Sequence, residues 1–156
     1  MREIKFRGFS KILNTWIYGD LIQSGSKFYI AKQGFLAPYE CFGTSINILG
    51  FEEFEDIFEV EPESIGQYTR LKDKNSKEIY ENDIVTFILP EKFGIKQKTH
   101  VGVIKYDSSI TSHKIYTYKN LKSFLHNYVY DCFYIADDTY IEVIGNIFEN
   151  PDLLEG

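Results

Sequence analysis

Three histidines and two cysteines are the side chains of this 156-residue chain best suited to bind a metal ion. Zinc sites usually show short, fixed spacings, such as two histidines four residues apart or a CxxC pair. His100, His113 and His126 show no such spacing, and Cys41 and Cys132 are far apart in the sequence. We therefore predict no metal site and no cofactor.

One group of residues could supply a nucleophile, its base and an orienting acid, because His126, Asp131 and Cys132 are close in the sequence. However, Cys132 precedes Phe133 in a strand-like segment, where a free cysteine usually packs as a small apolar side chain. No phosphate-binding loop, GxSxG or GxGxxG motif occurs. The sequence predicts buried free thiols and a protein that is not an enzyme.

An acidic segment is the first candidate for binding. Seven carboxylates lie between residues 52 and 63, and large apolar residues are interleaved with them. A solvated face explains such a cluster, but negative charge backed by apolar anchors can also dock on a basic protein surface. The residues proposed for this docking ridge are Phe51, Glu52, Glu53, Phe54, Glu55 and Asp56.

A basic and aromatic segment is the second candidate. Lys114, Tyr116 and Tyr118 alternate on one face of a predicted strand, and Lys119 and Lys122 follow it. Aromatic rings flanked by cations can bind single-stranded nucleic acid, because bases stack on the rings and phosphates meet the charges. Cross-strand packing of tyrosines is the structural alternative.

Charge is distributed unevenly along the chain. The net charge is −6, but residues 1–35 carry +4 and residues 36–65 carry −8. An acidic protein gains little from neutralising phosphates, which disfavours general nucleic-acid binding. The first residues alternate between charged and apolar types, and no apolar run approaches the length of a bilayer span. We therefore expect a cytoplasmic protein with no membrane partner.

The elements that position these residues are predicted to be mostly strands. The chain has 13 Phe and 12 Tyr, which favour strands, and few alanines, which favour helices. Alternation and turn residues predict strands at 4–7, 16–22, 27–32, 57–61, 64–69, 83–89, 99–106, 113–118, 132–136 and 140–148. Helical spacing predicts a helical turn at 51–56 and a short helix at 119–128. The strands after residue 82 indicate a small, SH3-like antiparallel barrel.

Four segments resemble the YopX family of phage and prophage proteins. They are REIKFR at residues 2–7, WIYGDL at 16–21, QYTRLKDKNSKEIYENDIV at 67–85 and IEVIGNIFENP at 141–151. Together they span nearly the whole chain. The resemblance implies a phage or prophage gene expressed in a bacterial host and an α+β fold dominated by antiparallel strands. It also implies an N-terminal α+β region, 1–66, and a C-terminal SH3-like barrel region, 67–156.

Single residues in these segments carry further expectations. The family pattern usually has glycine where this chain has Arg70, Ser76 and Asn82, so we expect turns with positive φ there. Asp83 is expected to cap the turn before the next strand, and Gly145 to mark a bulge or bend in the last one.

Together, these observations predict a non-enzymatic module that binds another protein or a second copy of itself. A small nucleic-acid-binding barrel that uses the lysine and tyrosine face is the alternative.

Overall fold

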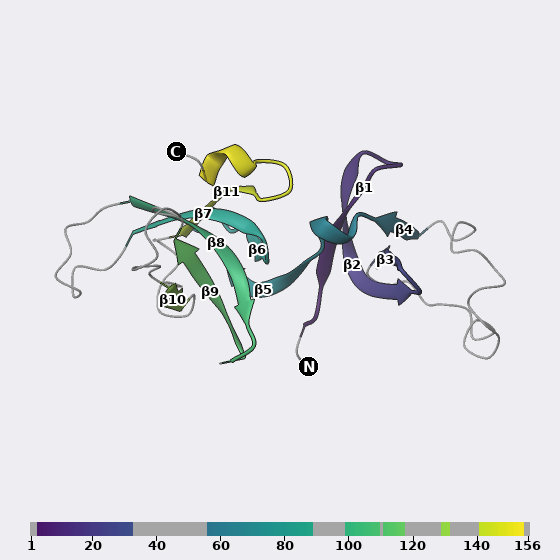
Figure 1. The fold of residues 1–156 in the computed structure, drawn as a ribbon, viewed down its shortest axis with the longest axis horizontal. Helices are drawn as coiled ribbons and strands as arrows, with labels where there is room; N and C mark the ends of the chain where they lie inside the picture. The colour runs from purple at the N-terminus through teal and green to yellow at the C-terminus, as the bar shows by residue number, and fades with distance from the viewer. Residues whose placement is uncertain are drawn as a thin grey trace. The chain divides into compact units, whose positions relative to one another are not determined.

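The computed structural model describes residues 3–32, 56–88, 99–109, 111–117, 129–131 and 141–154 (Figure 1). The chain divides into two compact units, Met1–Gln67 and Tyr68–Gly156. Where it is described, the chain is mostly antiparallel β-structure, and its only helical elements are two short 3₁₀ turns.

The N-terminal unit is an antiparallel sheet in which β1 has a partner on each side. It contains β1 (Phe6–Ser10), β2 (Thr15–Ser24), β3 (Lys27–Lys32), β4 (Ile57–Val60), the 3₁₀ turn η3 (Pro62–Ser64) and the start of β5 (Gly66–Lys72). The six strands of this sheet follow the order β4-β3-β2-β1-β5-β6, of which β6 (Glu78–Tyr80) belongs to the second unit. The two resembling segments at 2–7 and 16–21 are therefore neighbours, with Arg7 opposite Tyr18.

Alternation along β2 explains how this sheet forms a core. Ile17 is buried, whereas Tyr18 points to the opposite face and is largely exposed. Ile17 packs with Ile30 and Val60, and Phe28 borders this cluster. A period of two thus places the apolar side chains of three strands on one face of the sheet.

The C-terminal unit contains a second antiparallel sheet. The five strands of this sheet are β7 (Asp83–Ile88), β8 (Thr99–Asp107), β9 (Ser112–Thr117), β10 (Val129–Asp131) and β11 (Ile141–Asn146). The unit also contains the rest of β5, β6 and the 3₁₀ turn η5 (Pro151–Leu154). The order β10-β9-β8-β7-β11 repeats that of β4-β3-β2-β1-β5 in the first sheet, with β7 in the place of β1. The core contains Ile79, Val85, Phe87, Ile104, Ile115, Ile141 and Val143.

Most predicted strands in the described ranges are confirmed. β3 has the predicted bounds, and β2, β7, β8, β9 and β11 overlap their predicted segments closely. β1 begins two residues later than predicted and runs to Ser10. β4 confirms the strand predicted at 57–61, and β5 overlaps the strand predicted at 64–69. The described part of residues 1–66 contains no α-helix, so the α+β character predicted for this region is not seen there. Of the helical turn predicted at 51–56, only Asp56 is described, and residues 51–55 lie outside the described residues. So do the predicted helix at 119–128 and the strand at 132–136.

The turns where the family pattern has glycine have the expected conformation. Arg70, Ser76 and Asn82 have φ angles of 69°, 64° and 68°. Asp83 accepts a hydrogen bond from the Tyr80 backbone N–H at 2.8 Å, as expected for a cap. The β11 pairing with β7 shifts register between Val143 and Gly145, which confirms the predicted bulge.

Ser76→Gly is expected to stabilise the protein. Ser76 is exposed at positive φ, where an L-residue is strained and glycine is not. The expected gain in the free energy of unfolding is about 0.5–1 kcal/mol, measured by urea denaturation. Ser26→Gly is the control, because Ser26 is also an exposed turn residue but lacks positive φ. Equal effects of the two changes would contradict this account.

Candidate functional site

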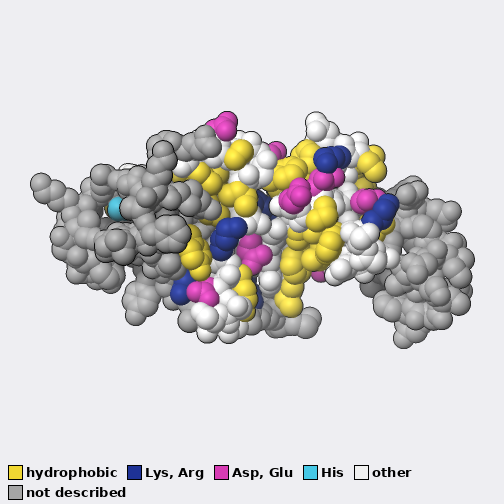
Figure 2. Space-filling model, viewed as in Figure 1, with side chains coloured by type: hydrophobic (Ala, Val, Ile, Leu, Met, Phe, Trp, Pro, Cys, Tyr) yellow, Lys and Arg dark blue, Asp and Glu magenta, His cyan; other side chains and the backbone are white. Residues whose placement is uncertain are grey.

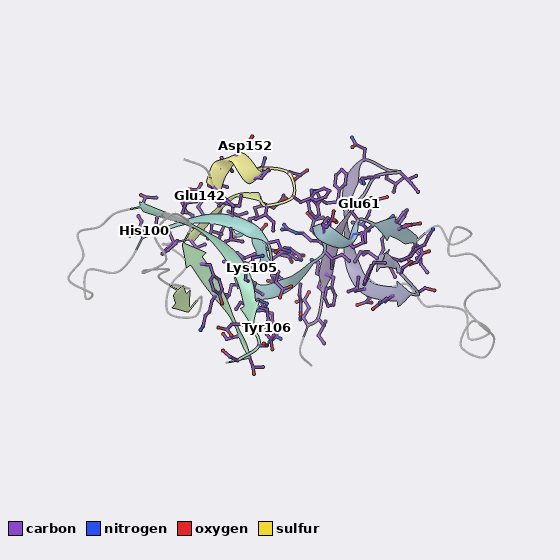
Figure 3. All side chains as sticks on the ribbon, in the orientation of Figure 1. Glu61, His100, Lys105, Tyr106, Glu142 and Asp152 are labelled. Atoms are coloured by element: carbon purple, nitrogen blue, oxygen red, sulfur yellow. The ribbon has the colours of Figure 1, made fainter. Side chains whose placement is uncertain are left out.

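The lysine and tyrosine face lies on β9 and its neighbour β8. Lys114 and Tyr116 lie on one face of β9, and the strand register places Lys105 directly opposite Lys114. Lys105 is labelled on β8 in Figure 3. Sequence reasoning missed Lys105, because only the pairing of β8 with β9 brings it to this face. Tyr118, Lys119 and Lys122 lie outside the described residues.

Asp107 is the centre of the hydrogen bonds on this face. Its Oδ2 lies 2.8 Å from Lys114 Nζ and accepts a long hydrogen bond of 3.5 Å from the Tyr116 hydroxyl. Its Oδ1 accepts hydrogen bonds from the Ser109 hydroxyl and backbone N–H at 2.5 and 3.0 Å. The hydrogen bond from Lys114, followed by those from Ser109, lowers the pKa of Asp107 from 3.8 to about 2. The charge of Lys114 is therefore offset by a neighbouring carboxylate.

Lys114→Met is expected to raise the pKa of Asp107 towards 3.8, because it removes the hydrogen bond that lowers this pKa most. The folded-state pKa is depressed, so the stabilisation is present above the unfolded-state pKa. It is lost as the pH falls from about 4 to about 2. NMR titration of the Asp107 carboxyl carbon measures the shift, and Lys77→Met, an exposed lysine of the same unit, is the control. An unchanged Asp107 pKa in Lys114→Met would show that Lys114 is not its main partner.

The acidic segment pairs with the basic residues that precede it. Glu61 Oε2 lies 2.6 Å from Lys11 Nζ, and Glu59 Oε2 lies 2.9 Å from Lys27 Nζ. Asp56, the one residue of the predicted docking ridge that is described, is exposed and lies 3.8 Å from Lys32 Nζ. These ion pairs join the positive segment 1–35 to the negative segment 36–65. The docking ridge itself stays a prediction, because residues 51–55 lie outside the described residues.

The histidines within the described ranges lie apart. His100 stacks on Phe87, with 5.4 Å between ring centroids. His113 Nε2 lies 3.2 Å from Glu81 Oε1, and its strand partner is Tyr106. Because Tyr106 is six residues along β8 from His100, the two histidine positions are separated by about 20 Å. His126 and both cysteines lie outside the described residues, and no metal-binding cluster occurs among those described.

The turn between β1 and β2 exposes the most accessible large apolar side chain of the described chain. We call residues 11–14 the hairpin tip. Ile12 is 83% exposed and Leu13 is 48% exposed. Sequence reasoning missed this feature, although two adjacent aliphatic residues between Lys11 and Asn14 give a recognisable signal: turns normally favour Gly, Pro, Asn, Asp and Ser.

The base of the hairpin tip is held by the segment that follows β4. The Phe9 backbone N–H donates to Ser64 Oγ at 2.7 Å, and the Phe9 carbonyl accepts from the Glu61 N–H at 2.9 Å. The Lys11–Glu61 ion pair adds a third connection, and Figure 3 shows Glu61 in this region of the N-terminal unit. Figure 2 shows hydrophobic and charged side chains side by side on the visible face of this unit. The tip is thus an apolar projection on an ordered support.

Comparison with known proteins identifies the family of the chain. The sequence model described as YopX protein matches residues 5–155, so the chain belongs to the YopX family. A crystal structure of protein EF1440 from Enterococcus faecalis is similar, with 23% identity over 99% of both chains and a TM-score of 0.45. No curated protein sequence matches the chain. Within the described ranges, no helix is long and apolar enough to cross a membrane.

Proposed function

We propose that this YopX-family chain is a non-enzymatic protein-interaction module that uses the hairpin tip as its contact element. The observation that supports this proposal is the exposure of Ile12 and Leu13 on a tip whose base is hydrogen-bonded to residues 61–64. Full burial of one such aliphatic side chain is worth about 1.5–3 kcal/mol. A tip that is already ordered loses little conformational entropy on binding, so more of this energy becomes affinity.

Residue-specific photo-crosslinking tests this proposal. A benzoylphenylalanine placed at position 13 is expected to form a discrete adduct with a protein in bacterial cells expressing the full chain. The same group at position 109, exposed in the C-terminal unit, is the control site. Ile12→Asp should abolish the adduct formed from position 13 without changing the urea denaturation midpoint. No adduct, or identical adducts from both positions, would overturn the proposal.

Self-association is one form of the same function. In that case the adduct would have twice the mass of the chain, and sedimentation velocity would show a dimer at high protein concentration. Ile12→Asp would shift this equilibrium towards the monomer. An adduct of any other discrete mass identifies a different partner protein.

The second candidate function is binding of single-stranded nucleic acid by the β8–β9 face. The observation in its favour is that Lys105 and Lys114 face each other across two strands, with Tyr116 on the same face. Asp107 counts against nucleic-acid binding, because this carboxylate neutralises the charge of Lys114. Fluorescence anisotropy of a labelled deoxythymidine oligomer tests it. This function requires affinity that falls with salt and is lower in Lys105→Ala; the absence of salt-dependent binding would exclude it.

The proposed fold of each unit is an SH3-like barrel. In both sheets a four-strand meander is followed by a fifth strand that pairs with the first, which is the strand order of SH3-like barrels. In the N-terminal unit, the hydrogen bond from Glu61 to Phe9 supports closure, because it brings the end of β4 to β1. Such barrels serve many functions, so this fold supports a binding role without specifying the ligand.

A further inference from the structure

We propose that the hairpin tip and η3 form a single recognition surface for a short peptide segment in which an aliphatic side chain lies beside a lysine or arginine. This inference rests on the proposed function and specifies its partner. We call the surface formed by Ile12, Leu13, Pro62 and Glu63 the tip–turn surface. All four residues are exposed, and they come from two segments joined by the hydrogen bonds of Phe9.

The charge of this surface favours a basic partner. Lys11 and Glu61 neutralise each other at 2.6 Å, so their pair adds no net charge to the surface. Glu63 is exposed in the first turn of η3 and forms no ion pair with any other described residue. The remaining charge of the tip–turn surface is therefore negative. A lysine or arginine of a ligand complements it, and an aspartate or glutamate is repelled.

The small size of the surface favours a short segment over a folded protein. Stable interfaces between folded proteins use about 20–30 residues on each side. Four exposed residues on one hairpin and one short turn are far fewer. They offer two aliphatic side chains, a proline ring and one carboxylate, which suits a single apolar anchor with an adjacent cation.

Peptide selection on the immobilised full chain tests this inference. A random heptapeptide library is expected to yield sequences with Leu, Ile or Val next to Lys or Arg. One enriched peptide is then synthesised with a fluorophore, and its affinity is measured by fluorescence polarisation. Leu13→Asp and Glu63→Lys are each expected to weaken binding at least tenfold. Asp152→Lys, the same reversal of charge at an exposed site of the C-terminal unit, should leave binding unchanged.

Reversing the charge of Glu63 is the more specific test, because it should change which peptides are selected. Selection on the Glu63→Lys protein should enrich Asp or Glu beside the aliphatic residue in place of Lys or Arg. Enrichment without a charge preference, or equal affinity for the wild-type and Glu63→Lys proteins, would overturn the inference. Urea denaturation midpoints confirm that each variant is folded.

The two proposals fail in different ways. A crosslink from position 13 without any enriched peptide would mean that the tip contacts a folded protein or a second copy of the chain. That result overturns the peptide inference and keeps the proposed function. Loss of both the crosslink and the peptide enrichment overturns both.

Discussion

Gly19→Ala is expected to lower the free energy of unfolding of the N-terminal unit by about 3 kcal/mol or more. A Cβ at this position would lie 1.8 Å from the Ala31 carbonyl oxygen and 2.8 Å from its carbonyl carbon. Both atoms belong to the backbone, so no change of side-chain rotamer relieves the overlap. Gly19 pairs with Phe6 on one side and Lys32 on the other, so movement of β2 disrupts two strand pairings.

Trp16, the single tryptophan of the chain, makes this measurement specific to the N-terminal unit. Urea denaturation followed by tryptophan fluorescence therefore reports the unit that contains Gly19. Gly25→Ala is the matched control, because a Cβ there meets nothing within 4 Å and the only cost is its φ of +61°. That cost is about 1–2 kcal/mol. A Gly19→Ala effect no larger than that of Gly25→Ala would contradict the close contact between β2 and β3.

Local sequence patterns predicted the strands well because their causes are local. β3 is a continuous apolar run between two lysines, and it follows a Ser-Gly-Ser turn, so its bounds can be derived from the sequence. The positive φ angles of Arg70, Ser76 and Asn82 were also predictable, because the family pattern has glycine at these positions. The family's glycines therefore indicate a backbone conformation that the residue types of this chain do not suggest by themselves.

The candidate surfaces were less predictable because their causes are not local. Lys11 and Glu61 are 50 residues apart in the sequence and form an ion pair only because the segment after β4 returns to β1. The acidic segment was predicted to dock on a basic partner, but three of its described carboxylates pair with lysines of the preceding positive segment. Lys105 joins the lysine and tyrosine face only through the β8–β9 register. These contacts depend on which strands pair, and residue composition alone does not predict that pairing.

Asp73→Ala is expected to destabilise the C-terminal unit by about 4 kcal/mol, because it removes several hydrogen bonds to one charged group. Asp73 is 3% exposed. Its Oδ1 accepts from the backbone N–H groups of Asn75 and Lys77 at 2.8 and 2.9 Å, which fixes the turn between β5 and β6. Its Oδ2 accepts from the buried N–H of Val143 at 3.1 Å. One carboxylate thus joins a turn to a strand 70 residues further along the chain.

Asp73→Asn separates these two roles. The amide oxygen can replace Oδ1 and keep both turn hydrogen bonds, but the amide nitrogen cannot accept the Val143 N–H. The expected loss is about half that of Asp73→Ala, or about 2 kcal/mol. Hydrogen exchange gives a local measurement: in Asp73→Asn the Val143 amide should exchange faster, beyond the change in global stability, while the Asn75 and Lys77 amides should not.

Asp152→Ala is the control for the loss of a carboxylate, because Asp152 is exposed in η5. An exposed substitution of this kind changes stability by about 0.5 kcal/mol or less. Equal effects of Asp73→Ala and Asp152→Ala on the urea midpoint would show that the buried carboxylate does not hold β11 to the turn. A large loss in Asp73→Ala together with selective exchange at Val143 in Asp73→Asn would show that it does. The resembling segments at 67–85 and 141–151 would then be linked by a structural requirement, since one supplies the carboxylate and the other the amide that it binds.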